Sequence, residues 1–173
     1  MKRIIIWVLL PLLLLLCIFF YPVSMALVFY NEDTNERQAF LPLEYGDEFQ
    51  IIFTHSVHLS DVVEKYRVTS DKQIEQFEFI FEEFGVGMPS NAQTGETFVY
   101  EEGRYHIRDM KNLFPELRVR NGKAVSQHRL VWGTHEVTFN DYMEPGAWMT
   151  LKIEDLTLWQ WLKGARIHEQ NTN

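Results

Sequence analysis

The chain has 173 residues, with 24 acidic and 16 basic side chains and a formal net charge of -8. This length allows one globular domain and one accessory segment. An acidic chain without a basic cluster is not expected to bind nucleic acid, because that binding depends on the neutralisation of phosphates. Hydrophobic residues make up 46% of the chain, which excludes a disordered protein.

The N-terminus is strongly apolar. No charged residue occurs from Ile4 to Tyr30, whereas Lys2 and Arg3 precede this run and all acidic residues follow it. A helix that spans a bilayer needs about 20 residues, and basic residues stay on the cytoplasmic side. The pattern predicts a single-pass protein of the cell membrane, with a cytoplasmic N-terminus and an extracytoplasmic C-terminal domain. A signal peptide cleaved near residues 24–26 is the alternative, and it would make the domain secreted.

Three segments are therefore expected along the chain. Residues 1–30 form a membrane anchor or signal sequence, residues 31–45 form a spacer, and residues 46–173 form an extracytoplasmic β domain. The only cysteine, Cys17, lies in the first segment, so the domain is expected to fold without a disulfide.

Short segments rich in β-forming residues recur after the spacer, with turn residues between them. Nine strands are expected, at residues 49–54, 62–69, 74–84, 97–100, 104–107, 117–120, 129–132, 136–139 and 148–153. In the third of these, Phe77, Phe79 and Phe81 are expected to share one face that packs in the core. Asn121-Gly122 is a strong signal for a hairpin turn.

The C-terminal segment is the one candidate for a helix after the anchor. Leu156, Trp159 and Leu162 recur at a spacing of three residues, which predicts a helix over residues 155–163 that Gly164 ends. The predicted fold class is thus all-β, mainly an antiparallel sandwich or a partly open barrel, with an N-terminal transmembrane helix and one short C-terminal helix.

Polar side chains gather where the strand 49–54 ends and the next one begins. His55, Ser56, Glu64 and Tyr66 supply an imidazole, two hydroxyls and a carboxylate. If a turn joins the strands, Glu64 can face His55 and select the tautomer of its imidazole. Ser56 beside His55 also suggests a nucleophile, but neighbouring residues of a strand point to opposite faces and no G-x-S-x-G motif surrounds the serine. These four residues are candidates for binding, with a purely structural strand end as the alternative.

A glycine-containing turn follows the strand 74–84. Gly85, Gly87 and Pro89 favour a tight turn whose backbone N–H groups could bind an anion. No Lys-Ser/Thr pair ends the motif, so it is not a phosphate-binding P-loop, and a structural turn is the alternative. Each polar patch follows the C-terminal end of a strand, with one strand between them, so both are expected on one rim about 10 Å apart. Together they would bind a small carboxylate-bearing solute or a loop of a partner.

The histidines do not predict a metal centre. His55 and His58 are three residues apart, a spacing that does not place both rings on one face of a strand. The chain has no His-Glu-x-x-His motif and no cysteine after Cys17. We therefore expect neither a metal nor another cofactor.

The two patches together resemble one bacterial family. The runs Thr54–Val57 and Phe84–Pro89, with Glu64 and Tyr66 between them, are similar to the domain of unknown function 1850 family over about residues 49–153. The resemblance implies a small exported or anchored protein, encoded beside tripartite ATP-independent periplasmic (TRAP) transporters of the TAXI type. It also implies that the partner is a membrane transporter or its solute-binding protein. The family has no settled catalytic residues to carry over to this chain.

Three functions are compatible with these observations. The preferred one is a non-enzymatic accessory or binding protein associated with TRAP-type solute uptake, because the chain has no convincing catalytic set. The second is a structural or assembly factor of the cell envelope that binds a protein by a β edge. The third is an extracytoplasmic hydrolase that uses His55, Ser56 and Glu64.

Overall fold

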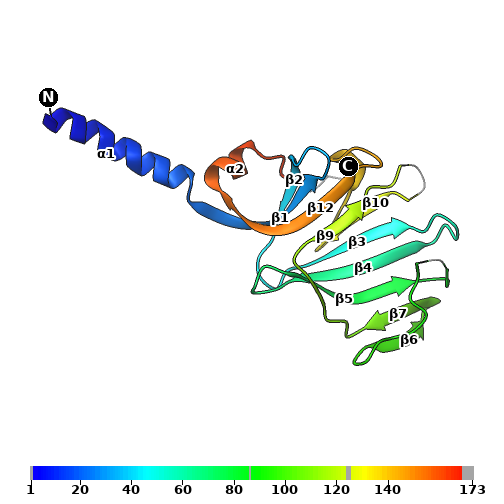
Figure 1. Ribbon diagram of the computed structural model, residues 1–173. Coiled ribbons are helices and arrows are strands. Elements are labelled where there is room, and N and C mark those ends of the chain that lie inside the picture. The colour runs from blue at the N-terminus through cyan, green and yellow to red at the C-terminus, as the bar shows by residue number, and fades with distance from the viewer. Residues whose placement is uncertain (1, 86, 124–125, 169–173) are drawn as a thin grey trace.

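Two antiparallel β-sheets build the fold, which a computed structural model describes for residues 2–85, 87–123 and 126–168 (Figure 1). The smaller sheet contains β1 (Pro22–Asn31), β2 (Arg37–Pro42), β9 (Leu117–Arg120) and β12 (Trp148–Thr157). The larger sheet contains β3 (Glu48–Thr54), β4 (Asp61–Val68), β5 (Ile74–Phe81), β6 (Thr97–Glu101), β7 (Arg104–Arg108), β8 (Asn112–Phe114), β10 (His128–Trp132) and β11 (His135–Thr138). The helices are α1 (Lys2–Phe19), α2 (Leu158–Lys163) and the short 3-10 helix η1 (Phe139–Asp141).

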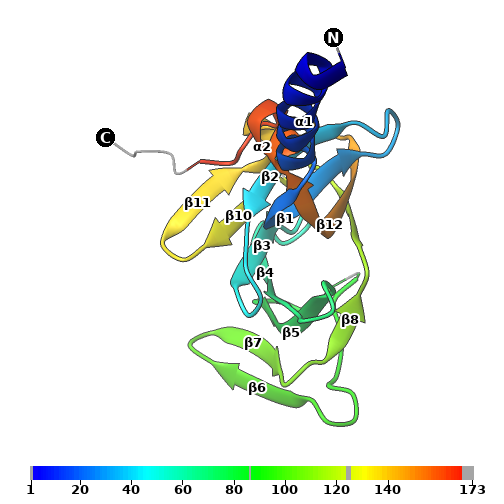
Figure 2. The same cartoon turned by 90° about the vertical axis from the view of Figure 1, so that its left-hand side faces the viewer.

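The order of the strands places the two sheets against each other. The smaller sheet runs β2-β1-β12-β9, and the larger runs β11-β10-β3-β4-β5-β7-β6, with β8 paired to β5. The larger sheet extends past the smaller one at β6 and β7 (Figure 2). The prediction of a mainly antiparallel β fold is confirmed, and the strands within the described residues do not close into a barrel.

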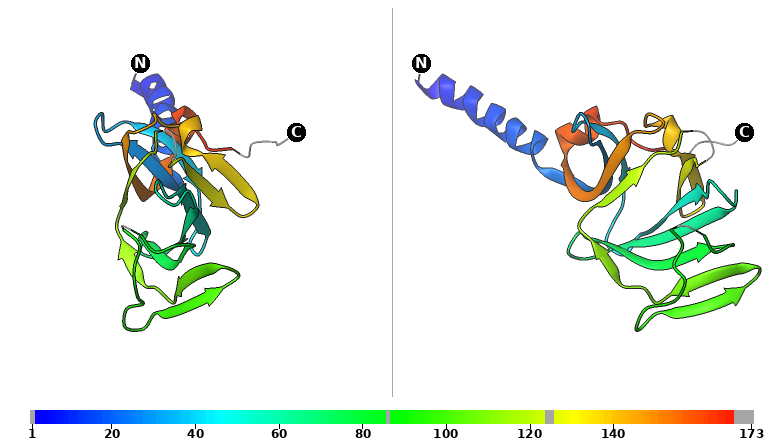
Figure 3. Two further views of the ribbon diagram at one scale, coloured as in Figure 1. Left: turned by 90° about the vertical axis from the view of Figure 1, so that its right-hand side faces the viewer. Right: turned by 45° about the vertical axis from the view of Figure 1, so that its right-hand side comes forward.

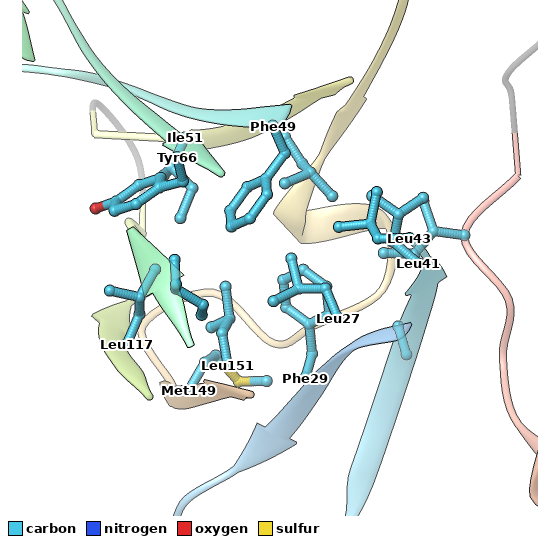
Figure 4. Packing of buried hydrophobic residues seen from close by; sticks show 14 of the residues in the cluster. Leu27, Phe29, Leu41, Leu43, Phe49, Ile51, Tyr66, Leu117, Met149 and Leu151 are labelled. Carbon is cyan, nitrogen blue, oxygen red and sulfur yellow. The ribbon is translucent and has the colours of Figure 1, made fainter. Parts of the chain in front are cut away.

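The main core lies between the sheets (Figure 4). Leu27 and Phe29 of β1 belong to the same buried cluster as Phe49 and Ile51 of β3. The alternation of side chains along β3 turns Phe49 and Ile51 inward and leaves Gln50 on the outer face of the larger sheet. A second cluster around Val62, Phe79 and Phe81 fills the inner face of the larger sheet toward β7.

Strand β1 is buried on both faces. Leu27 and Phe29 point into the main core, whereas Ala26 and Val28 join a separate cluster with Phe40, Leu156 and the partly buried Trp161. All four of these β1 residues are fully buried. A strand that is covered on both faces needs a continuous apolar sequence instead of an alternating one.

This burial corrects the prediction of a membrane anchor over residues 4–30. The apolar run is divided between α1, which ends at Phe19, and β1, which begins at Pro22 and pairs with β2 and β12. Among the residues that the structure describes, no helix combines the length and the apolar character needed to cross a bilayer. The prediction of a single-pass membrane protein with an N-terminal transmembrane anchor is therefore wrong.

Two strands of the smaller sheet lie upstream of residue 46, where the β domain was expected to begin. Strand β1 falls in the segment predicted as anchor or signal sequence, and β2 falls in the predicted spacer. The chain leaves α1 and enters the sheet directly, with α1 projecting away from the sheets (Figure 3). An aromatic contact between Phe19 and Trp159, with ring centroids 6.3 Å apart, joins α1 to α2.

The C-terminal helix is present but shorter than expected. Residues 155–157 continue β12, and α2 begins after Thr157, whose hydroxyl accepts a hydrogen bond from the Gln160 N–H while the Gln160 side chain accepts one from the Thr157 N–H. This reciprocal capping box starts the helix. The Gly164 N–H donates to the Gln160 carbonyl and ends it, as predicted.

The predicted hairpin at Asn121-Gly122 is wrong. Strand β9 pairs with β12, and β10 pairs with β3 and β11, so the segment between β9 and β10 passes from one sheet to the other. The buried Asn121 amide donates to Asn140 Oδ1 at 2.8 Å and to the Glu144 carbonyl at 3.1 Å. Its side chain thus holds this crossing against the segment around η1, a long-range role that the dipeptide does not reveal.

Replacing Phe29 by alanine tests whether residues 22–31 are a core strand. Phe29 is fully buried and its ring lies 5.6 Å from that of Phe139, edge to face. Phe29→Ala is expected to lower the free energy of unfolding by about 3–5 kcal/mol, because it leaves a cavity between the sheets. The matched control is Val23→Ala, in the half-exposed beginning of the same strand. Urea titrations measure both, and equal, small effects would contradict the assignment.

Candidate functional site

The two patches predicted to share a rim lie side by side. Strands β3, β4 and β5 are sequential antiparallel neighbours, so β3 and β5 run in the same direction. The segments that follow them therefore lie at the same end of the strands. The His55 and His58 rings stack with their centroids 5.0 Å apart. A Cβ atom on Gly85 would lie 3.5 Å from His55 Cε1 and only 2.6 Å from His58 Nε2. We call this surface, residues 55–60, 83–85 and 87–88, the histidine rim.

The turn between β3 and β4 organises the imidazoles. The His55 N–H donates to the Ser60 carbonyl at 2.8 Å, and the Leu59 N–H donates to the His55 carbonyl at 2.9 Å. His55 Nδ1 accepts the backbone N–H groups of Val57 and His58 at 3.3 and 3.4 Å. The ring is therefore part of the turn, with Nδ1 as the hydrogen-bond acceptor.

The neighbouring loop contributes a carboxylate and a close backbone contact. His58 Nδ1 lies 2.8 Å from Glu83 Oε2, which links the turn after β3 to the segment after β5. Gly85 lies against the His58 ring, where a side chain would collide with it. The Met88 N–H donates to the Gly85 carbonyl, and Gly87 has a φ of +88°, a left-handed conformation that glycine adopts readily. Pro89 follows this turn.

The structure does not bring Glu64 and Tyr66 to the rim. Glu64 pairs with Ile51 of β3, four residues before His55, which is roughly 13 Å along a strand. Tyr66 lies in the main core, stacked on Phe49, and its hydroxyl donates to Glu64 Oε2 at 2.9 Å. Burial raises the pKa of the Glu64 carboxyl, and the hydrogen bond from Tyr66 only partly offsets this effect.

The predicted grouping of His55, Ser56 and Glu64 is therefore not formed. In the part of the chain that the structure describes, no hydrogen bond joins Ser56 to an imidazole or to a carboxylate. The same described residues contain no group of three or more His, Cys, Asp or Glu side chains placed to hold a metal ion.

Several residues of the rim were not singled out as binding candidates from the sequence. Val57 and Leu59 in the turn are 71% and 66% exposed, and Phe84 after β5 is 46% exposed. Leu59 has a φ of +57°, a left-handed conformation that is uncommon for a branched side chain and stores strain. Exposure of apolar residues cannot be predicted from their type alone, so only the spacing of His55 and His58 hinted at this surface.

A second polar cluster lies on the outer face of the larger sheet. Glu78 of β5 has a side chain that is only 10% exposed, and its carboxylate lies 2.7 Å from Lys65 Nζ and 2.9 Å from His106 Nδ1. Arg108 Nε donates to it at 3.0 Å and the same guanidinium also pairs with Glu101. Burial alone would raise the pKa of the Glu78 carboxyl, but hydrogen bonds from Lys65, His106 and Arg108 outweigh it and hold the pKa at about 2.

Comparison with known proteins identifies the family. Residues 49–139, more than half of the chain, match the family described as Domain of unknown function (DUF1850). The chain therefore belongs to that family, as its two motifs indicated. No curated protein and no solved structure matches the chain.

Replacing Gly85 by alanine tests the contact between the two halves of the rim. The added methyl group would meet the His58 ring and push it from Glu83. We expect the NMR signals of both the His58 and His55 rings to shift, because the rings stack. Ser70→Ala, at an exposed position in the turn between β4 and β5, is the control. Unchanged imidazole signals in the Gly85 variant would contradict the contact.

The Glu78 cluster predicts a dependence of stability on pH. Because the pKa of Glu78 falls from 4.5 to about 2 on folding, its stabilising contribution is complete above pH 4.5 and is lost as the pH falls toward 2. Between about pH 5 and about pH 3 the free energy of unfolding of the wild type should fall more than that of Glu78→Gln. Glu82→Gln, just after the end of β5 and paired with Arg104, should retain the wild-type fall in the free energy of unfolding. Urea titrations at both pH values measure these free energies. If Glu78→Gln lost as much stability as the wild type, Glu78 would not be the cause of the pH dependence.

Proposed function

We propose that this protein is a non-enzymatic accessory protein that docks a partner protein through the histidine rim. The observation that carries this proposal is the coincidence of exposed apolar side chains with strained backbone at the rim. Val57 and Leu59 expose apolar side chains in the same turn as the paired imidazoles, and Phe84, which also packs on Tyr105, exposes nearly half of its side chain beside Gly85. Apolar side chains clustered within a polar surround mark sites of protein association.

The backbone of Leu59 supports the same proposal. A left-handed conformation at leucine costs stability, and such costs persist where the surrounding structure imposes them and function uses them. Here the conformation directs an apolar side chain into solvent, where it contributes little to the core. A partner that covers Leu59 would recover the hydrophobic free energy of that side chain.

The geometry favours docking over hydrolysis. A serine hydrolase needs the hydroxyl within hydrogen-bond reach of a base, and that base held by a third group. His55 Nδ1 is already an acceptor within its own turn, and Glu64 is bonded to Tyr66 inside the fold. These contacts weigh against a catalytic role for His55 and give Glu64 a structural role.

The family resemblance suggests the partner. We infer that the rim docks a component of a solute transporter, either the membrane transporter itself or its solute-binding protein, and that the protein assists solute uptake. The imidazoles and Glu83 would supply polar contacts around the apolar centre, as in other protein interfaces.

The test compares two exposed leucines. Asparagine is enriched in the left-handed region, so Leu59→Asn should fold at least as stably as the wild type while it removes the apolar contact. The control is Leu113→Asn in β8, where a leucine that is 56% exposed, against 66% for Leu59, lies outside the rim. Copurification from native cells, with transporter components quantified by mass spectrometry, should show at least a tenfold loss for Leu59→Asn only. Equal recovery with both variants, or no transporter component with the wild type, would contradict the proposal.

A further inference from the structure

A cleft lies at the other end of β3 from the histidine rim. Its volume is about 600 Å³, within the range of small-molecule sites. Gln50, Lys65 and Phe77 of the larger sheet line it, together with Trp132 of the β10–β11 hairpin and the acidic pair Asp47 and Glu48. The cleft shares no lining residue with the rim, so its occupation can be tested separately.

The floor of the cleft is a row of side chains across neighbouring strands. Gln50 pairs with Val131 of β10 on one side and with Lys65 of β4 on the other. Adjacent strands are about 4.8 Å apart, so the Gln50 and Lys65 side chains leave the outer face next to each other, and the Lys65 ammonium group lies 2.7 Å from Glu78 on the next strand. The floor therefore carries two residues with hydrogen-bond donors, one of them charged.

A β-bulge places an aromatic ring at one side of this floor. Lys65 pairs with Glu78 and Tyr66 pairs with Gln76, so Phe77 is an extra residue in β5. The bulge changes the alternation, and Phe77 lines the outer cleft instead of sharing the core face with Phe79 and Phe81 as predicted. Bulges commonly redirect a side chain next to a functional site.

Phe77 is also held in place by a charged neighbour. The Arg67 guanidinium lies 4.8 Å from the centroid of the Phe77 ring, and it bonds Glu48 Oε1 through Nε and Nη2 at 3.1 and 2.7 Å. Trp132, beside His135 with a centroid distance of 5.5 Å, supplies a second aromatic wall. The cleft thus has aromatic sides and a carboxylate at its mouth.

Lys65 keeps an attraction for an anion although it contacts Glu78. The Glu78 carboxylate also accepts from His106 and Arg108, Arg108 pairs with Glu101 as well, and the Lys65 side chain stays 28% exposed, so Glu78 does not occupy the whole ammonium group. An ammonium group has three donors. A carboxylate in the cleft could accept from Lys65 and from the Gln50 amide.

We propose that the cleft binds a zwitterionic solute of the amino-acid class with an apolar or aromatic side chain. The carboxylate of the solute lies against Lys65 and Gln50 at the floor. Its ammonium group faces Asp47 and Glu48 at the mouth, and its side chain lies by Phe77 and Trp132. Charges of both signs separated by aromatic walls favour such a solute over a simple anion, which the two mouth carboxylates would repel.

The experiment titrates the full chain with four probes by isothermal titration calorimetry. L-phenylalanine carries all three recognition groups, whereas 3-phenylpropionate lacks the ammonium group, phenethylamine lacks the carboxylate and glycine lacks the apolar side chain. L-phenylalanine should bind at least tenfold more tightly than each of the other three. Absence of saturable binding by L-phenylalanine, or equal affinity for the first three probes, would overturn the proposal.

Two variants assign the charges to their places. Lys65→Met should weaken the binding of L-phenylalanine at least tenfold and remove its advantage over phenethylamine, whereas the control Lys72→Met, paired with Asp155 away from the cleft, should not. Because Lys65→Met also changes the surroundings of Glu78, Asp47→Asn provides a second test. Asp47 Oδ2 accepts the Glu44 N–H, a role that the asparagine oxygen can keep.

In the Asp47→Asn variant, L-phenylalanine is expected to bind no more tightly than 3-phenylpropionate. The exposed Asp71→Asn in the β4–β5 turn is its control and should behave as the wild type. Thermal melts followed by circular dichroism check that each variant is folded. A folded Lys65→Met and a folded Asp47→Asn that both bind L-phenylalanine as the wild type does would overturn the proposal.

Discussion

The burial of β1 on both of its faces is the constraint on which the architecture depends. Leu27 and Phe29 on one face close the core against the larger sheet, and Ala26 and Val28 on the other face require a cover of their own. Phe40 of β2 and Leu156 of β12 provide much of that cover, and Trp161 of α2 packs against it. The C-terminal helix is thereby tied to a strand near the N-terminus, and the two ends of the chain form one sheet.

The larger sheet then separates two surfaces of different chemistry. At one end of β3 the short turn after Thr54 places stacked imidazoles and strained, exposed Leu59 beside the glycine turn after β5. At the other end the bulge at Phe77 opens an aromatic and charged cleft on the outer face. The proposed docking surface and the proposed solute cleft lie at opposite ends of β3, an arrangement compatible with the proposed accessory role in uptake.

Ionic networks allow the outer face of the larger sheet to remain without a covering helix. Glu78 is surrounded by Lys65, His106 and Arg108, and its low pKa keeps the carboxylate ionised over the physiological range. Buried charges are costly unless they are paired and fully hydrogen-bonded. The arrangement satisfies this condition while it leaves Lys65 at the floor of the cleft, so one network supports both the fold and the proposed recognition of a carboxylate.

The sequence by itself determined the β class, because period-two alternation and turn residues depend only on local geometry. It located the strands from β3 to β7 closely, and the order of three consecutive strands was enough to place His55 and Gly85 at one edge. The short helix ended by Gly164 was also readable, because its cap is local. The family was recognisable from two short motifs.

Only the tertiary structure decided which face each segment buries. A charge-free run has the same composition whether lipid or two layers of protein surround it, so β1 was mistaken for part of an anchor. One extra residue in β5 moves Phe77 from the core face to the outer face of the sheet. The hydrophobic periodicity of the sequence does not reveal such a bulge. Glu64 was expected at the rim but lies inside the fold, where Tyr66 is its hydrogen-bond partner. Burial and register are set by contacts between residues far apart in the chain, and these contacts create both the histidine rim and the cleft.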